Sequence, residues 1–133
     1  MSGLPAFLTK DQVVLIHQRM IAGFGGDPGI RDDGLLQSAV AMPAARFSGE
    51  LLHKGIPAMA AAYLFHLCRN HPFVDGNKRT AIVAAEVFVR LNGRSLSATD
   101  DELEQITVGV AEGSVSKKEV IAFFRRHVLE SEE

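Results

Sequence analysis

The segment from residue 71 to residue 79, His-Pro-Phe-Val-Asp-Gly-Asn-Lys-Arg, concentrates side chains that can do chemistry. His71 is a candidate general base for an attacking hydroxyl group. Asp75 offers hard carboxylate oxygens that could hold Mg²⁺ against phosphate. Lys78 and Arg79 add two positive charges that would attract an anion. A base, a metal ligand and a phosphate cradle are the parts that phosphoryl or nucleotidyl transfer requires.

The same segment leads into a predicted helix, and the start of a helix can itself bind an anion. The first N–H groups of a helix have no partner within it, and the helix dipole favours a negative ligand there. Gly76 lets the backbone approach a phosphate closely. A purely structural interpretation also exists, because Asp75 and Asn77 could cap the helix. The dense grouping of these residues at one helix start favours function.

Two strongly apolar segments flank the motif and predict a central pair of helices. One runs from Ala58 to about Asn70, and the other from about Asn77 to Leu91. Both are apolar on nearly every face, which is typical of helices in the middle of a bundle. Pro57 suits the first turn of the earlier helix. The motif therefore joins two buried helices.

Four further helices are predicted around this pair. The first covers residues 9–22, with a capping box at its start and a glycine cluster at its end, and the second runs from about residue 33 to residue 42. The fifth begins near Asp100, and the last follows a second capping box at 116–119. Residues 44–55 are expected to form a loop or a short hairpin. The fold class is all-α, a helical bundle with about six helices.

The composition is that of an ordinary globular protein. With 133 residues, 47% of them apolar and 23% charged, we expect a single domain over residues 1–133. Cys68 is the only cysteine, so no intramolecular disulfide forms, which favours a reducing cytosol. The sequence shows neither a secretory start nor an apolar run of membrane-spanning length. We therefore expect a cytoplasmic protein without membrane association.

The charge is unevenly distributed along the chain. Residues 46–94 carry seven basic and three acidic side chains, whereas residues 95–133 carry four basic and nine acidic ones. The middle of the chain is therefore where an anionic ligand would be attracted. The net charge of −2 argues against direct binding of nucleic acid, which usually needs a broad basic face.

The nine-residue motif resembles the signature of the Fic family, His-Pro-Phe-x-Asp/Glu-Gly-Asn-Gly-Arg. Lys78 stands where that signature has its last glycine, which is the pattern of the Doc (death-on-curing) branch of the Phd/Doc toxin–antitoxin type. Ile82 stands where AMP-transferring members have a second arginine. Gly76 stands where the Doc branch has alanine. Further similarity lies in 24–29, Tyr63, Arg69, 78–81, 90–93 and 107–109.

The resemblance implies a role for each residue of the site. His71 would deprotonate a serine or threonine of a target protein, and Asp75 would bind Mg²⁺. Residues 44–55 lie where members of the family carry a flap that positions the target at the base. The phosphates of ATP would be bound by Gly76, Asn77, Lys78, Arg79 and Arg69. In the Doc branch the lysine is associated with ATP turned so that its terminal phosphate faces the target. The resemblance thus implies a toxin that is a protein kinase, inhibits translation through elongation factor Tu, and has a Phd-like antitoxin as its partner.

Control by a partner is also suggested by a missing signature. Fic proteins that restrain themselves carry an inhibitory Ser/Thr-x-x-x-Glu-Gly/Asn helix. The nearest candidate is Glu112-Gly113, but Val108 occupies the Ser/Thr position. Two other functions stay open at this stage: transfer of AMP to a protein hydroxyl, and a non-catalytic module that binds a nucleotide or a partner.

The remaining histidines are predicted to be structural. His66 and His71 are five residues apart and would not share a helix face, so a zinc pair is not expected. His17, His53 and His127 lie alone on predicted helices or loops.

Overall fold

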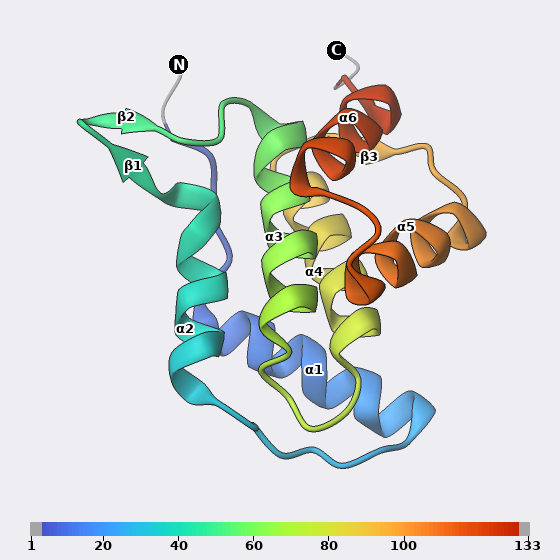
Figure 1. Ribbon diagram of the computed structural model, residues 1–133. Coiled ribbons are helices and arrows are strands. Elements are labelled where there is room, and N and C mark those ends of the chain that lie inside the picture. Colours follow the sequence, from blue (N-terminus) through green and yellow to red (C-terminus); the bar gives the residue numbers. More distant parts are fainter. Residues whose placement is uncertain (1–3, 131–133) are drawn as a thin grey trace.

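The computed structural model describes residues 4–130, and six α-helices account for most of them (Figure 1). This confirms the predicted all-α fold class. No helix in this range is long and apolar enough to cross a membrane. The helices are α1 (Lys10–Phe24), α2 (Asp33–Ala41), α3 (Ile56–Asn70), α4 (Asn77–Leu91), α5 (Asp100–Glu112) and α6 (Lys117–His127).

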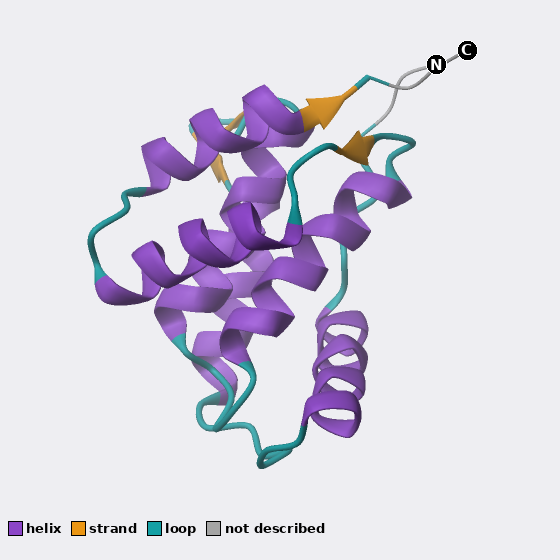
Figure 2. Ribbon diagram, turned by 90° about the vertical axis from the view of Figure 1, so that its right-hand side faces the viewer, coloured by secondary structure: helices purple, strands orange, loops and turns teal. Residues whose placement is uncertain are grey.

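Helices α3 and α4 form the centre of the bundle, and the other helices surround them (Figures 1 and 2). The two central helices carry small residues that are fully buried, among them Ala60, Ala61, Ala81 and Ala84. Small side chains let two helix backbones approach closely, so this pair packs more tightly than larger residues would allow. Tyr63 and Phe88 fill the space beside them, with ring centroids 5.1 Å apart. The central pair is the one that the sequence predicts.

The predicted helix boundaries need small corrections at three places. Helix α1 continues past Gly23 to Phe24, and the turn comes at Gly25, whose φ is 87°. Helix α2 ends at Ala41 and passes into a short 3-10 turn over Met42–Ala44 that contains Pro43. Helix α3 begins at Ile56 rather than Ala58, with Pro57 in its first turn. Proline in a first turn does not interrupt a helix, because the N–H that it lacks has no partner there.

Two short antiparallel strand pairs complete the described chain. Strand β1 (Arg46–Phe47) pairs with β2 (Glu50–Leu51), which makes the hairpin expected within residues 44–55. Strand β3 (Ser95–Leu96) pairs with β4 (Val128–Leu129), and the sequence does not predict β4. A two-residue strand is too short to show the alternation of apolar and polar side chains from which strands are recognised.

The hairpin lies far from the motif. It precedes α3, whereas His71 follows the last residue of α3, and the two lie toward opposite ends of the bundle in both views (Figures 1 and 2). A helix of 15 residues spans about 22 Å. The hairpin therefore does not flank His71 in this structure. The loop between α1 and α2 flanks His71 instead.

Candidate functional site

The candidate site is built where α3 ends and α4 begins. Gly76 precedes α4 in a left-handed conformation, with a φ of 80°, and no side chain caps the N-terminus of this helix. A Cβ at Gly76 would lie 3.3 Å from Cδ1 of Ile21. Both the backbone conformation and the close approach of α1 therefore favour glycine here. The first N–H groups of α4 are left available to an anion.

The loop between the two helices is anchored by Phe73, whose side chain is 1% exposed. The amide of Asn77 holds the backbone of Phe73 twice: it accepts from the N–H at 2.9 Å and donates to the carbonyl at 2.8 Å. The imidazole of His17 stacks on the Phe73 ring, with centroids 3.7 Å apart. An amide oxygen and an amide nitrogen can each make a second hydrogen bond, so Asn77 keeps capacity for a ligand.

His71 is exposed at the C-terminal end of α3. Its backbone is left-handed, with φ 49° and ψ 55°. This conformation is unfavourable for a residue that carries a Cβ. It turns the chain out of the helix, so that the motif loop leads directly into α4.

Asp75 is also exposed, and its carboxylate faces the loop between α1 and α2. Its Oδ2 accepts a hydrogen bond from the backbone N–H of Asp27 at 2.7 Å. Its backbone carbonyl accepts one from Nε2 of His17 at 2.8 Å. Within residues 4–130, no group of three or more histidine, cysteine or acidic residues could hold a metal ion. A magnesium ion at Asp75 would thus take most of its ligands from phosphate and water, as it commonly does.

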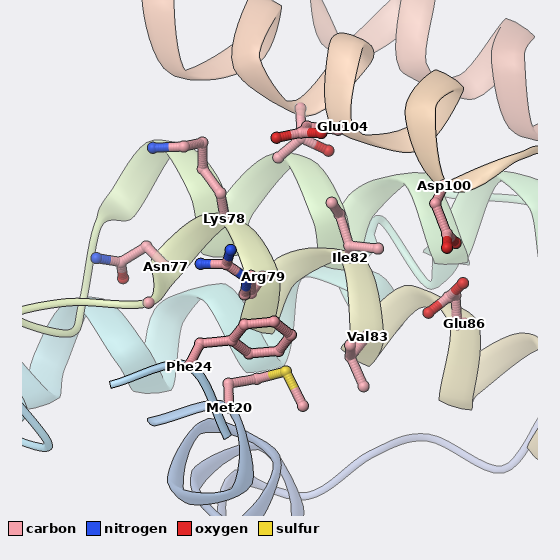
Figure 3. A pocket seen from close by; sticks show the side chains of 12 residues that line it. Met20, Phe24, Asn77, Lys78, Arg79, Ile82, Val83, Glu86, Asp100 and Glu104 are labelled. Atoms are coloured by element: carbon pink, nitrogen blue, oxygen red, sulfur yellow. The ribbon is translucent and has the colours of Figure 1, made fainter. Parts of the chain in front are cut away.

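Two adjoining hollows meet at the start of α4 and share Gly76, Asn77 and Lys78. The smaller has a volume of about 150 Å³ and also contains His71 and Asp75. The larger has a volume of about 460 Å³ and extends along α4 between α1 and α5 (Figure 3). The larger volume lies within the range of small-molecule sites. The arrangement puts the candidate base and metal ligand in one hollow and room for an extended ligand in the next.

The larger hollow has basic, apolar and acidic regions. Lys78 and Arg79 lie at the helix start, and the Arg79 guanidinium sits over the ring of Phe24, 4.0 Å from its centroid (Figure 3). Farther along α4 lies Glu86, which shares the hollow with Asp100 at the start of α5. Burial raises the pKa of Glu86, the charge of Asp100 raises it further, and Arg90 opposes the shift. The walls between these charged ends are formed by Met20, Phe24, Ile82, Val83 and Thr107, and Glu104 of α5 adds a carboxylate.

The structure brings together all the predicted site residues except Arg69. Arg69 is exposed, and it lines neither of the two hollows. Its guanidinium lies beside Gly113 at the end of α5, where an added Cβ would be 3.6 Å away. Burial raises the pKa of the Cys68 thiol, and the positive charges of Lys78 and Arg69 oppose this shift.

Sequence reasoning missed three contributors to the site: His17, Asp27 and Arg31. The sequence predicts that His17 is structural, and it is: it is buried and bonds the carbonyl of Asp75, a contact to the site that has no sequence signal. Arg31 donates to the backbone carbonyls at the end of α3. From the sequence, the glycine-rich segment before Arg31 is expected only to end the first helix. One glycine of this segment has a packing reason. A Cβ added at Gly26 would lie 3.0 Å from Cβ of Asp75, which is too close for a larger residue.

Comparison with known proteins adds independent findings. Residues 7–89 match the model of the Fic/DOC family, which is well over half of the chain. The chain is 33% identical over 119 residues to the protein kinase doc of Escherichia phage P1, covering 90% of this chain and 93% of that protein. It is 49% identical over 78 residues to the toxin Doc of Mycolicibacterium smegmatis, covering 59% of this chain and 60% of that protein.

Proposed function

We propose, because this chain belongs to the Fic/Doc family, that it is the toxin of a toxin–antitoxin pair. We propose further that it is a protein kinase that moves the terminal phosphate of ATP to a serine or threonine hydroxyl. The observation that carries the proposal is the junction of two hollows at the start of α4. There His71 and Asp75 share one hollow, while Lys78 and Arg79 flank the other.

In the proposed reaction, His71 removes the proton of the target hydroxyl as its oxygen attacks the terminal phosphorus of ATP. The bond between that phosphorus and the bridging oxygen breaks, and ADP leaves. Asp75 would hold Mg²⁺, which neutralises phosphate charge when bound. The free N–H groups at the start of α4, with Lys78 and Arg79, bind the phosphate oxygens. Asn77 adds its side-chain amide, and Gly76 leaves the backbone accessible.

Lys78 sets the direction of transfer in this proposal. A glycine at this position would leave room for further phosphates along the helix start. The lysine side chain fills part of that room and adds a positive charge, so the terminal phosphate rather than the α-phosphate faces His71. Ile82 lies one turn farther on and is apolar. It offers no second cation for phosphates lying along α4.

We propose elongation factor Tu as the target and a Phd-like antitoxin as the restraining partner. The name toxin Doc of the mycobacterial relative supports the toxin assignment, and the name protein kinase doc of the phage relative supports the activity. The larger hollow, with its apolar walls and charged ends, suits an amphipathic segment of the antitoxin. The proposed action of this chain on translation would take place in the cytoplasm. Arg69 is retained as a supporting phosphate ligand that would have to turn toward the site.

The test uses ATP labelled in the α- or the γ-phosphate. The purified chain is incubated with Mg-ATP and elongation factor Tu, and label on the factor is followed by gel and mass spectrometry. Transfer of the γ label with release of ADP is the expected result. Transfer of the α label would replace the kinase by an AMP transferase. Binding of ATP without transfer of either label to any protein of a host extract would indicate a non-catalytic module.

A further inference from the structure

The left-handed backbone of His71 requires something to hold it. Outside glycine, this conformation is unfavourable and persists only where neighbouring groups fix it. With φ 49° and ψ 55°, it is one of two non-glycine positions with positive φ within residues 4–130, the other being Ser48 in the hairpin turn. The candidate base His71 therefore has a strained backbone at the end of a helix, where the last carbonyl groups lack partners inside the helix.

Arg31 supplies those partners from the loop before α2. Its Nε donates to the carbonyl of His71 at 2.7 Å, and its Nη2 donates to the carbonyl of Asn70 at 2.9 Å. The backbone N–H groups of Arg31 and Asp32 both donate to the carbonyl of Pro72, at 2.7 and 3.0 Å. One residue thus engages three consecutive carbonyl groups at the point where α3 turns into the motif loop.

The chemistry of arginine suits this place. Its planar guanidinium presents several donors in a fixed fork, so it can hold two carbonyl groups in a set relation. A cation at the C-terminus of a helix is also favoured by the helix dipole. Lysine offers the charge without the fork. Arg31 is itself exposed, so its replacement removes contacts to the motif loop without opening the core.

We propose that Arg31 is a positioning residue, which fixes the backbone of His71 so that its imidazole faces the hollow it shares with Asp75. This inference rests on the proposed function, in which His71 is the base. It assigns a role in transfer to a residue outside the motif, through two hydrogen bonds that span 40 and 39 positions of the sequence.

The test compares Arg31→Ala, Arg31→Lys and Arg19→Ala in the full chain, with γ-labelled ATP and elongation factor Tu. Arg19 is an exposed arginine of α1 and serves as the charge-matched control. Misplacement of a catalytic group lowers kcat more than substrate binding, so we expect Arg31→Ala to lose roughly tenfold or more in kcat while KM for ATP changes by less than about twofold. The kcat of Arg31→Lys should lie between those of the wild type and Arg31→Ala, and the kcat of Arg19→Ala should match that of the wild type.

A second measurement does not depend on activity. The ¹³Cα and ¹³Cβ chemical shifts of His71 report its backbone conformation, and they should move away from left-handed values in Arg31→Ala but not in Arg19→Ala. The inference would be overturned if Arg31→Ala kept the full kcat of the wild type or left the chemical shifts of His71 unchanged. If Arg31→Ala fails to fold, the same two measurements on Arg31→Lys decide. If the wild type transfers no label at all, the proposed function fails, and the His71 shifts alone decide whether Arg31 holds this backbone.

Discussion

His71 combines an exposed imidazole with a backbone held from outside its own helix. Because the side chain is exposed and contributes nothing to the core, its replacement should affect chemistry and leave the fold intact. We expect His71→Ala to lower the rate of phosphate transfer roughly 10²–10⁴-fold, the usual contribution of a general base. Its melting temperature and far-UV circular dichroism should match the wild type. An unfolded variant, or one with full activity, contradicts the assignment of His71 as the base.

In the proposed function, Lys78 determines which phosphate of ATP, the terminal one or the α-phosphate, faces His71. It lies at the boundary of both hollows, so its side chain limits how many phosphates can lie along the start of α4. We expect Lys78→Gly to lose transfer of the γ label and to gain at most weak transfer of the α label, since Ile82 supplies no second cation. The measurement follows both labels in parallel for the wild type and the variant. Undiminished γ transfer by Lys78→Gly would show that orientation is set elsewhere.

The motif residues could be predicted from the sequence because they lie within nine consecutive positions at one helix start. Their supporting residues could not. His17 reaches Asp75 across 58 positions and Arg31 reaches His71 across 40. Such contacts have no local pattern, and a single buried histidine or exposed arginine is common in any globular protein. Only the folded loop between α1 and α2 reveals what they do.

At the scale of elements, the start of α4 differs from the starts of α1, α5 and α6 and resembles that of α3, which follows Gly55 without a side-chain cap. Helices α1, α5 and α6 each begin with a capping box, in which Thr9, Thr99 and Ser116 satisfy free N–H groups. Helix α4 begins after Gly76 with no side-chain cap. A cap at this position would compete with a phosphate for the same N–H groups. The boxes at Thr9 and Ser116 are recognised from the sequence; the one at Thr99 was missed.

The segment before α1 is fastened to α3 by one buried side chain. The hydroxyl of Tyr63 accepts a hydrogen bond from the N–H of Leu8 at 2.8 Å, and burial raises the pKa of Tyr63 to about 12. Tyr63→Phe keeps the ring but leaves the N–H of Leu8 without this acceptor. An unsatisfied buried group costs about 1–3 kcal/mol. We expect urea denaturation of Tyr63→Phe to show a free energy of unfolding that is lower by this amount, with an unchanged m-value. Phe65→Leu, at a partly buried site of the same helix, tests whether any change in α3 has the same effect.

Where α4 approaches α5, Glu86 makes stability depend on pH. Its pKa in the folded protein is raised above the ordinary value of 4.5, chiefly by burial and then by Asp100. The folded state therefore binds this proton more tightly than the unfolded state, and stability falls as the pH rises above 4.5 through the raised pKa. We expect Glu86→Gln to melt at a higher temperature than the wild type at pH 7 but not at pH 4. Glu112→Gln, at an exposed position, is the control; an equal gain from it would mean that net charge, not burial of Glu86, is responsible.

On the scale of the whole molecule, the sequence predicts the bundle better than its periphery. The central helices are recognised because they are apolar on nearly all faces, and their packing in the structure follows from that composition. The hairpin and the β3–β4 pair are short, and their positions depend on what they pack against. For this reason the expected flap position of residues 44–55 is not seen beside His71, and the loop between α1 and α2 lies there instead.

The proposed pairing with an antitoxin gives a test that involves the entire protein. A kinase that acts on a translation factor should stop growth when nothing restrains it. Val108 interrupts the nearest match to a self-inhibitory helix, so restraint is expected from a partner. We expect induced expression of the chain in its native host to arrest growth, and co-expression of the proposed antitoxin to relieve the arrest. Colony counts after induction measure both effects.

The decisive control is the chain with His71→Ala. It has the same fold and the same surface for a partner, but it lacks the proposed base, so it should be harmless at an equal level of expression. Purified, it should still bind the antitoxin, because the groove along α4 with Met20, Phe24 and Ile82 is untouched. Arrest by the variant as strong as by the wild type would mean that toxicity does not come from transfer chemistry. Harmless high-level expression of the wild type would count against a toxin altogether.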